Sequence, residues 1–352
     1  MKRNNIKIKS GVITGLMLAG LVLFLLAGRA FSKNERFAFN FGLQTVYDDN
    51  ILDYSDADLD LLDDPSVPDN RYSIKSTDDF IFVPELEVIY KSQLAGHSLH
   101  TGLVGRYYYY SENDIKRYFR IEGYFKRYFN RRTYIQGTIG YLPDYYYRNS
   151  YSSTVGYQEA KFDKIFLEGK LSIKLNNYFT TNFSYLYADK DFIPLFDERD
   201  IKEHEFQGQA VYYPAKYWKS WFLYSFITAF GAGANSIQYR RDTSFDANLL
   251  TFGSRLYLKG LKKKSFELAG QVSYKIVYFQ TSKATVEDRY RLGREDSHWY
   301  LTLMAKHAIN SKFNVGVNFK KTNKTVNLPA QELIGFLESS SNSVYLILDY
   351  SL

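Results

Sequence analysis

The chain has 352 residues, no cysteine, 33 tyrosines, 27 phenylalanines and a formal charge of +7. The lack of cysteine excludes disulfides, thiolate metal sites and thiol catalysis. Five basic residues, Lys2, Arg3, Lys7, Lys9 and Arg29, lie in the first 32 positions without a balancing acid, so the rest of the chain is nearly neutral and its charge does not indicate nucleic-acid binding.

The first 32 residues have the organisation of a secretory signal peptide. Residues 1–9 are basic, residues 12–27 are mostly apolar and small, and Ala30 and Ser32 place small side chains where a signal peptidase cleaves. The apolar run is shorter than the ~20 residues that a transmembrane helix requires. We therefore predict that residues 1–32 are a cleaved signal peptide and that residues 33–352 form one domain.

Most of the remaining chain alternates between apolar and polar side chains with a period of two, which is typical of β-strands. The clearest case is residues 164–175, where Ile165, Leu167 and Leu171 alternate with lysine, glutamate and serine. A three-residue turn at 176–178 would keep the polar face continuous into the next strand. Charges at every second position of such strands would be very costly on a lipid face, so we expect them to point into an interior.

The same pattern predicts fourteen strands, and a single two-faced sheet of that length must close on itself. The predicted strands are residues 36–47, 79–91, 98–110, 116–129, 132–147, 163–175, 179–189, 202–213, 218–232, 245–259, 265–279, 297–308, 312–322 and 342–352. Connections after even-numbered strands are short, and those after odd-numbered strands are mostly long, except around 112–115. The fold class is therefore all-β: a closed antiparallel up-and-down transmembrane β-barrel.

Two stretches resemble known families. The last strand carries apolar residues at alternate positions from Val344 to Leu352, and it resembles the C-terminal assembly signal of bacterial outer-membrane barrels of the porin-like type. Residues 37–51, ending in Tyr47-Asp48-Asp49-Asn50-Ile51, are similar to the opening of putative β-barrel porins encoded with exopolysaccharide systems. These resemblances imply a location in the bacterial outer membrane, and short turns then face the periplasm together with both termini.

The inward face is expected to line a narrow lumen, because fourteen strands lie between the filled eight-stranded barrel and the sixteen-stranded porin. The predicted pore-lining residues are Glu85, Arg106, Tyr118, Arg120, Glu122, Tyr124, Lys126, Lys164, Glu168, Lys170, Lys174, Arg255, Lys275 and Lys306. Further inward charges are expected at Glu87, Glu203, Glu205, Lys259, Glu267, Lys320 and Asp349. Basic residues outnumber acids in this set, which predicts a modest preference for anions.

Two features of the inner wall allow a structural or a binding interpretation. Arg106 should lie beside Arg120, with Glu85 and Glu122 as diagonal neighbours, either as an ion-pair ladder that stiffens the wall or as a rung that binds solute. Tyrosines at 107–110 and 145–147 fall at the outer rim, where they suit an aromatic girdle. Inward members such as Tyr108 could instead stack against a sugar or another planar ligand.

The first long loop is acidic, and Asp56, Asp58 and Asp60 have the alternating carboxylates of a calcium loop. Leu61 and Val67 stand where such a loop needs glycine and a bidentate glutamate, so a solvated acidic loop is the alternative. We predict no resident metal and no cofactor.

Catalysis is not expected. The five histidines are His97, His100, His204, His298 and His307, and His298, near Asp296 and Ser297 at the outer rim, is the best candidate for a catalytic role. None of the serine and histidine motifs of barrel phospholipases is present.

The expected function is an outer-membrane channel, either a porin for passive diffusion of small solutes or the conduit of a polysaccharide or other secretion system. The alternative is a non-conducting adhesin or assembly scaffold whose lumen is closed by the first loop. Expected partners are outer-membrane lipids and lipopolysaccharide, the barrel-assembly machinery, and a small solute or polysaccharide, but no nucleic acid.

Overall fold

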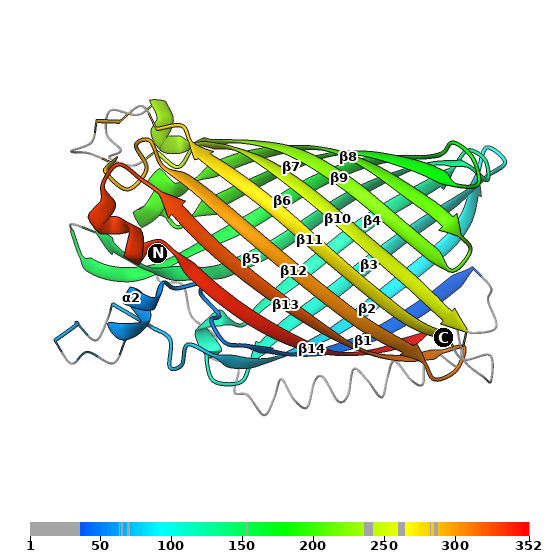
Figure 1. Cartoon of the computed structure of the whole chain (residues 1–352), viewed down its shortest axis with the longest axis horizontal. Coiled ribbons are helices and arrows are strands. Elements are labelled where there is room, and N and C mark those ends of the chain that lie inside the picture. The colour runs from blue at the N-terminus through cyan, green and yellow to red at the C-terminus, as the bar shows by residue number, and fades with distance from the viewer. Residues whose placement is uncertain are drawn as a thin grey trace, which may run out of the picture.

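The computed structural model describes residues 36–62, 64, 66–68, 71–152, 154–235, 242–259, 265–281, 283, 284 and 288–351. The predicted signal peptide lies outside the described residues. Within them, fourteen antiparallel strands form one closed barrel, in which each strand pairs with its sequence neighbours and β1 pairs with β14 (Figure 1). The strands are β1 (Phe37–Asp48), β2 (Asp79–Leu94), β3 (His97–Tyr110), β4 (Tyr118–Tyr128), β5 (Thr133–Ser152), β6 (Gly156–Lys174), β7 (Phe179–Phe192), β8 (Ile201–Ala215), β9 (Trp218–Gly231), β10 (Phe245–Lys259), β11 (Ser265–Phe279), β12 (Glu295–Ala308), β13 (Phe313–Asn327) and β14 (Ser339–Ser351).

The predicted closed barrel and its strand count are confirmed. The main error concerns length, because β5 and β6 continue to Ser152 and back from Gly156, well past the predicted limits of 147 and 163. Two register shifts, between Leu142 and Tyr145 and between Tyr146 and Arg148, interrupt their alternation. The hairpin therefore extends as a paired ribbon beyond the point where the period-two pattern ends.

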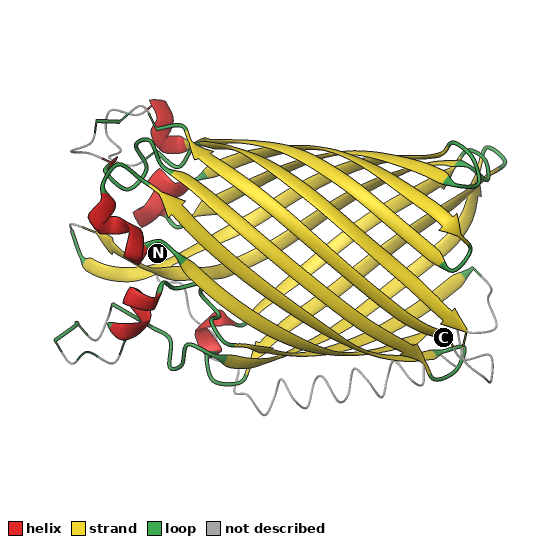
Figure 2. Cartoon of the chain, viewed as in Figure 1, coloured by secondary structure: helices red, strands yellow, loops and turns green. Residues whose placement is uncertain are grey.

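The two ends of the barrel differ. The helices of the described residues lie at one end, here called the loop end, and the described connections at the other end, the turn end, are tight (Figure 2). The helices are α2 (Asp56–Asp60), η1 (Asp114–Lys116), η2 (Pro194–Arg199), η3 (Ala232–Asn235) and η4 (Gln331–Phe336). At the turn end, Ala95 and Gly96 both have positive φ, as a two-residue hairpin turn requires. No helix of the described residues is long and apolar enough to cross a membrane.

The two faces of the barrel wall have opposite chemistry. Large apolar side chains such as Leu103, Phe125, Leu167 and Phe252 alternate along the strands and are exposed on the outside. Their sequence neighbours point inward, and cross-strand partners share a face, so the polar set forms one continuous inner wall. A closed sheet with an apolar exterior is how strands satisfy their backbone groups inside a bilayer.

Small apolar clusters occupy the inner wall only towards the loop end. Val46, Ile81, Val83 and Tyr110 form one of them on β1 to β3. Ile227 packs with Ala247 and Val277 in another, which explains why β9 alternates poorly in sequence: both of its faces are apolar. These clusters and the loops that cover them make the loop end the more tightly packed part of the lumen.

Candidate functional site

The inner wall is the candidate site, and the register places all fourteen predicted pore-lining residues on it. Glu85 pairs with Arg106, and Arg106 with Arg120. The other predicted residues follow on the same face of β4, β6, β10, β11 and β12. The wall also carries cations that were not predicted, namely Lys91, Arg148, Lys190, Lys219 and Lys324, and the acids Asp48, Asp79 and Asp296.

Arginines and glutamates on β2 to β4 form an ion-pair ladder across the middle of the wall. Arg106 bonds to Glu85 through Nε, and its Nη1 lies 3.2 Å from Glu122 Oε1. Glu122 also pairs with Arg120. Glu85 is directly opposite Arg106, not diagonal as predicted, and Glu122 is the diagonal neighbour. Each carboxylate here has an arginine partner, so the positive and negative charges of this part of the wall balance.

Towards the turn end, most inward cations lack such partners. Arg255 Nη1 lies 3.1 Å from Glu267, and Lys306 Nζ lies 2.5 Å from Asp349. Lys126, Lys170, Lys174 and Lys219 make no ion pair with any described residue. Lys126 instead lies 4.0 Å from the centre of the Tyr134 ring. The turn end therefore presents uncompensated positive charge to the lumen.

Towards the loop end, inward cations and acids alternate. Lys190 pairs with Glu203 at 3.2 Å, and Lys324 pairs with Asp296 at the same distance. Asp296 is also held by Arg294 at 2.6 Å. Lys164 and Lys275 have no ion pair among the described residues, but Glu203 acts on both electrostatically. Positive charge is consequently better compensated here than at the turn end.

Tyrosines at the loop end stack mainly on one another. The Tyr108 and Tyr118 rings lie 4.2 Å apart and nearly parallel, and Tyr118 meets Tyr145 edge-on at 4.9 Å. Tyr145 continues the chain to Phe162 at 5.1 Å. Because Tyr108 already has an aromatic partner, its geometry favours a structural role over stacking on a ligand.

Three inward aromatic rings lie flat over glycines of the neighbouring strand. Tyr124 covers Gly102, Phe166 covers Gly140 and Trp221 covers Gly253. A Cβ atom at Gly253 would lie 2.1 Å from Trp221 Cζ2, so only glycine permits this arrangement.

The first long connection, residues 49–78 and here called loop 1, is docked across the loop end. Asn50 Nδ2 donates to the Ser340 carbonyl at 3.1 Å, and Asp49 accepts from the Asn342 side chain at 2.7 Å. Further along, Leu52 and Tyr54 pack against Tyr146 of β5. Loop 1 thus reaches from β14 to β5, over the ends of the strands between them.

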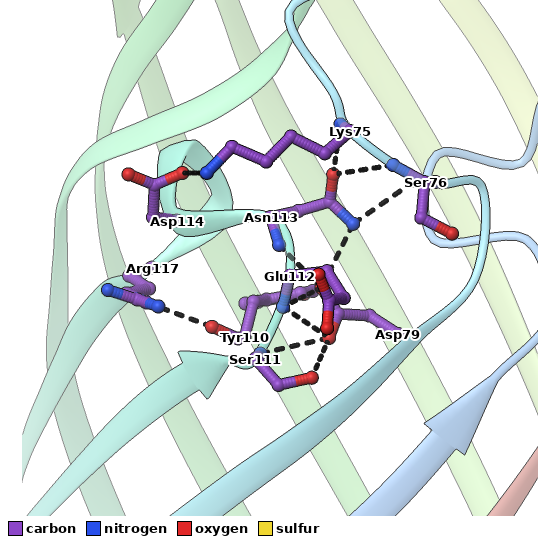
Figure 3. A network of polar contacts seen from close by, with 9 residues as sticks. All are labelled: Lys75, Ser76, Asp79, Tyr110, Ser111, Glu112, Asn113, Asp114 and Arg117. Atoms are coloured by element: carbon purple, nitrogen blue, oxygen red, sulfur yellow. Dashed lines mark hydrogen bonds and ion pairs between the residues drawn. The ribbon is translucent and has the colours of Figure 1, made fainter.

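A buried polar network fixes the far end of loop 1 (Figure 3). Asn113 Oδ1 accepts from the Lys75 backbone N–H at 2.7 Å, and Asn113 Nδ2 donates to the Ser76 carbonyl at 3.0 Å. Asp79 accepts from the Asn113 and Ser111 backbone N–H groups at 2.8 and 2.9 Å. Asn113 and Asp79 are almost fully buried, so the bonds operate without competition from water.

Lys116 of η1 is buried beneath this loop and has no carboxylate partner among the described residues. Its ammonium group lies 3.4 Å from the Tyr145 phenol oxygen and 3.3 Å from the Tyr146 carbonyl. The ladder between β4 and β5 ends at Ile121 and Tyr141, so β5 has an unpaired edge here, and Lys116 satisfies one of its carbonyls. Burial, followed by repulsion from Arg148, lowers the pKa of Lys116 to about 8, although Asp53 opposes the shift.

The described histidines lie on both faces of the wall. His204 Nδ1 contacts the Tyr185 hydroxyl at 2.7 Å on the outward face. His298 is inward and is the fourth residue of β12, opposite Lys275 and Lys324, so it lies further inside the strand than the predicted start at residue 297 places it. Asp58 pairs with Arg71 at 3.4 Å. No group of three or more metal-ligating side chains occurs among the described residues.

Comparison with known proteins gives similarities of architecture. No protein-family model matches the chain, and no curated protein matches it in sequence. Solved structures similar to it include a bacterial polysaccharide outer membrane secretin (10% identity, 89% of this chain and 98% of that one, TM-score 0.49). Also similar is an anion-selective porin from Comamonas acidovorans (8% identity, 90% of this chain and 98% of that one, TM-score 0.43). So is the outer membrane channel DcaP of Acinetobacter baumannii (10% identity, 90% of this chain and 96% of that one, TM-score 0.45). These similarities concern the barrel as a fold.

Proposed function

We propose that the chain forms a water-filled channel with a preference for anions in a bacterial outer membrane. The observation that carries the proposal is the uncompensated charge of the inner wall, above all at Lys126, Lys170, Lys174 and Lys219. Charged groups of this kind require water or a counter-ion, because burying them dry costs several kcal/mol each. A hydrated, cationic wall attracts anions and repels cations.

Location and orientation follow from the same physics. The apolar exterior suits a bilayer, and the predicted signal peptide would direct the chain out of the cytoplasm. Short turns at one end and long loops at the other support an orientation in which the turn end and both termini face the periplasm. The exterior would contact lipids and lipopolysaccharide after insertion by the barrel-assembly machinery, and the lumen would pass small solutes or serve as a polysaccharide conduit.

Selectivity is tested with neighbouring lysines on opposite faces of β13. Lys320 is inward, 5.8 Å from the centre of the Tyr300 ring, whereas Lys321 is exposed on the outward face. In a planar bilayer with a salt gradient, the reversal potential of the refolded chain should indicate a mild anion preference. Lys320→Gln should move it towards cations and Lys321→Gln should not. Equal effects of the two substitutions, or a cation preference of the parent, would refute the proposal.

A second candidate is a barrel closed by loop 1, since that loop is docked on both β14 and β5. The Leu52→Ala and Tyr54→Ala double variant removes the apolar anchor of the loop and keeps every charge of the wall, although Arg148 loses the Tyr54 ring that lies 5.6 Å from it. Silence from the parent combined with steady currents from this variant would favour the closed barrel. Steady currents from both would favour the open channel.

A further inference from the structure

Trp221, Lys219, Lys170 and Arg255 form a cluster on the inner wall near the turn end, here called the turn-end platform. Trp221 belongs to β9 and lies over Gly253 of β10. Lys219 Nζ lies 5.7 Å from the centre of the Trp221 ring. Arg255 is directly opposite Lys219, and Lys170 of β6 is near enough to act on it electrostatically. Three inward cations from three strands thus lie near one another, and one of them, Lys219, lies beside the indole.

The charges of the platform are not balanced. Glu267 is the acid that acts on Lys219, and its carboxylate already pairs with Arg255 at 3.1 Å. Lys219 and Lys170 have no ion pair with any residue in the described part of the chain. Arg255 Nε is buried without a hydrogen-bond partner. Two lysines therefore remain available to an anionic group from the solute.

The aromatic part of the platform presents a flat apolar surface beside these cations. With glycine beneath it, the indole lies along the wall. Indole faces stack on the apolar faces of rings, and lysines form charge-assisted hydrogen bonds with carboxylates. A solute that carries a ring and a carboxylate uses both parts at once.

We propose that the turn-end platform is a binding subsite for a ring-shaped solute bearing a carboxylate, with the ring on Trp221 and the carboxylate on Lys219 and Lys170. The inference rests on the proposed function in that a solute must reach the inner wall. It goes further by naming the solute chemistry and its place, near the mouth of the barrel that faces the periplasm in the proposed orientation. A neutral ring or a small carboxylate would each engage only half of the platform.

The test uses the fluorescence of Trp221 in the detergent-solubilised chain, without any measurement of current. The chain has three tryptophans, so Trp218→Phe and Trp299→Phe leave Trp221 as the only indole. Titration with glucuronate at ~0.15 M salt, where the screening length is ~8 Å, should give a saturable change. Glucose and acetate at equal concentration should give none. Lys219→Gln should weaken glucuronate binding at least about tenfold, which corresponds to ~1.4 kcal/mol.

Lys164→Gln is the matched control, because it removes an inward lysine of the loop-end half that also lacks an ion pair among the described residues. It should leave glucuronate binding unchanged. The heat-dependent gel mobility of each variant checks that the barrel is folded. The inference would be overturned if glucose or acetate gave the same response as glucuronate, or if glucuronate gave none. Unchanged glucuronate binding in folded Lys219→Gln would also overturn it. Anion-selective current without a fluorescence response would overturn the inference alone, whereas saturable binding in a barrel that passes no current would overturn only the channel.

Discussion

The buried Lys116 should make the docking of loop 1 more stable at alkaline pH. Its pKa falls to about 8 in the folded protein, chiefly through burial, whereas an exposed lysine titrates near 10.5. Between these values the undocked lysine keeps its proton and the docked one has lost it. Stability therefore rises with pH across this window, and the shift of about 2.5 units corresponds to ~3 kcal/mol.

Amide hydrogen exchange of residues 111–117 and of loop 1, corrected for intrinsic rates, measures this effect between pH 7 and 10.5. The wild type should gain up to ~3 kcal/mol of protection, whereas Lys116→Met should show a much smaller rise because the titrating lysine is gone. Burial raises the pKa of Tyr72 to about 12 and also raises that of Tyr54, so these two phenols stay neutral in the same range. The Arg148 guanidinium lowers the pKa of Tyr147 to about 8, but this ring is more than a third exposed, so its contribution to the rise is small.

Lys75→Met is the control, since Lys75 is exposed and its ion pair with Asp114, at 2.9 Å, lies at the surface. Its pH profile should match that of the wild type. A rise of equal size in Lys116→Met would show that other groups cause the effect and would refute the reasoning.

Three further substitutions test particular contacts. Arg106→Met removes the partner of Glu85, while Glu122 keeps Arg120. Urea unfolding in detergent should therefore show an unfolding free energy lower by ~1–3 kcal/mol, partly recovered by adding Glu85→Gln. No loss would mean that water compensates the ladder fully. Asn113→Leu abolishes the hydrogen bonds to Lys75 and Ser76 and should lower hydrogen-exchange protection at residues 75–79 by ~1–3 kcal/mol. Unchanged protection would show that the network does not hold loop 1. Gly253→Ala should lower the free energy of unfolding by ~1–3 kcal/mol, because its Cβ meets Trp221. Gly208→Ala is the control and should lower it little, because nothing lies within 4 Å of the added Cβ. Equal losses would contradict the close packing of the indole.

Alternation along the strands was enough to predict the barrel, its strand number and the inward face of the predicted wall residues. The turn at 176–178 shows why: Lys174 pairs with Thr180, the register in which the polar faces of β6 and β7 are continuous. Period-two alternation is a local property, and closure follows once every strand has two distinct faces. That the inward residues line an open pore stays a prediction.

The parts that could not be predicted depend on contacts distant in sequence or on broken periodicity. Tyr145 lies beyond a register shift, so counting by twos from Tyr141 gives it the wrong face, and the inward face of Arg148 is recovered only because a second shift cancels the first. Lys219 follows Trp218 in a strand with two apolar faces, where alternation carries no signal. The position of the Trp221 indole depends on Gly253, which lies more than thirty residues away in sequence. Only the strand register shows that the two residues are neighbours. Loop 1 is read as acidic and solvated from composition; its Asp53, Asp56 and Asp60 are exposed, but Leu52 and Tyr54 are buried against Tyr146, an anchor that composition does not reveal.

The uneven lengths of β4 and β5 bear on how foreign sequences could be displayed on this barrel. Beyond Tyr141, β5 pairs only with β6, and loop 1 together with Lys116 covers its other side. A peptide inserted near Thr154, at the tip of the β5–β6 hairpin, adds to an exposed tip and leaves these contacts intact, and such tips tolerate insertion well. The same peptide within residues 50–54 would uncover a strand edge, and unpaired edges recruit strands from other chains. The hairpin tip is therefore the better site for an epitope tag or a fused binder, and loop 1 should be kept whole in any such fusion.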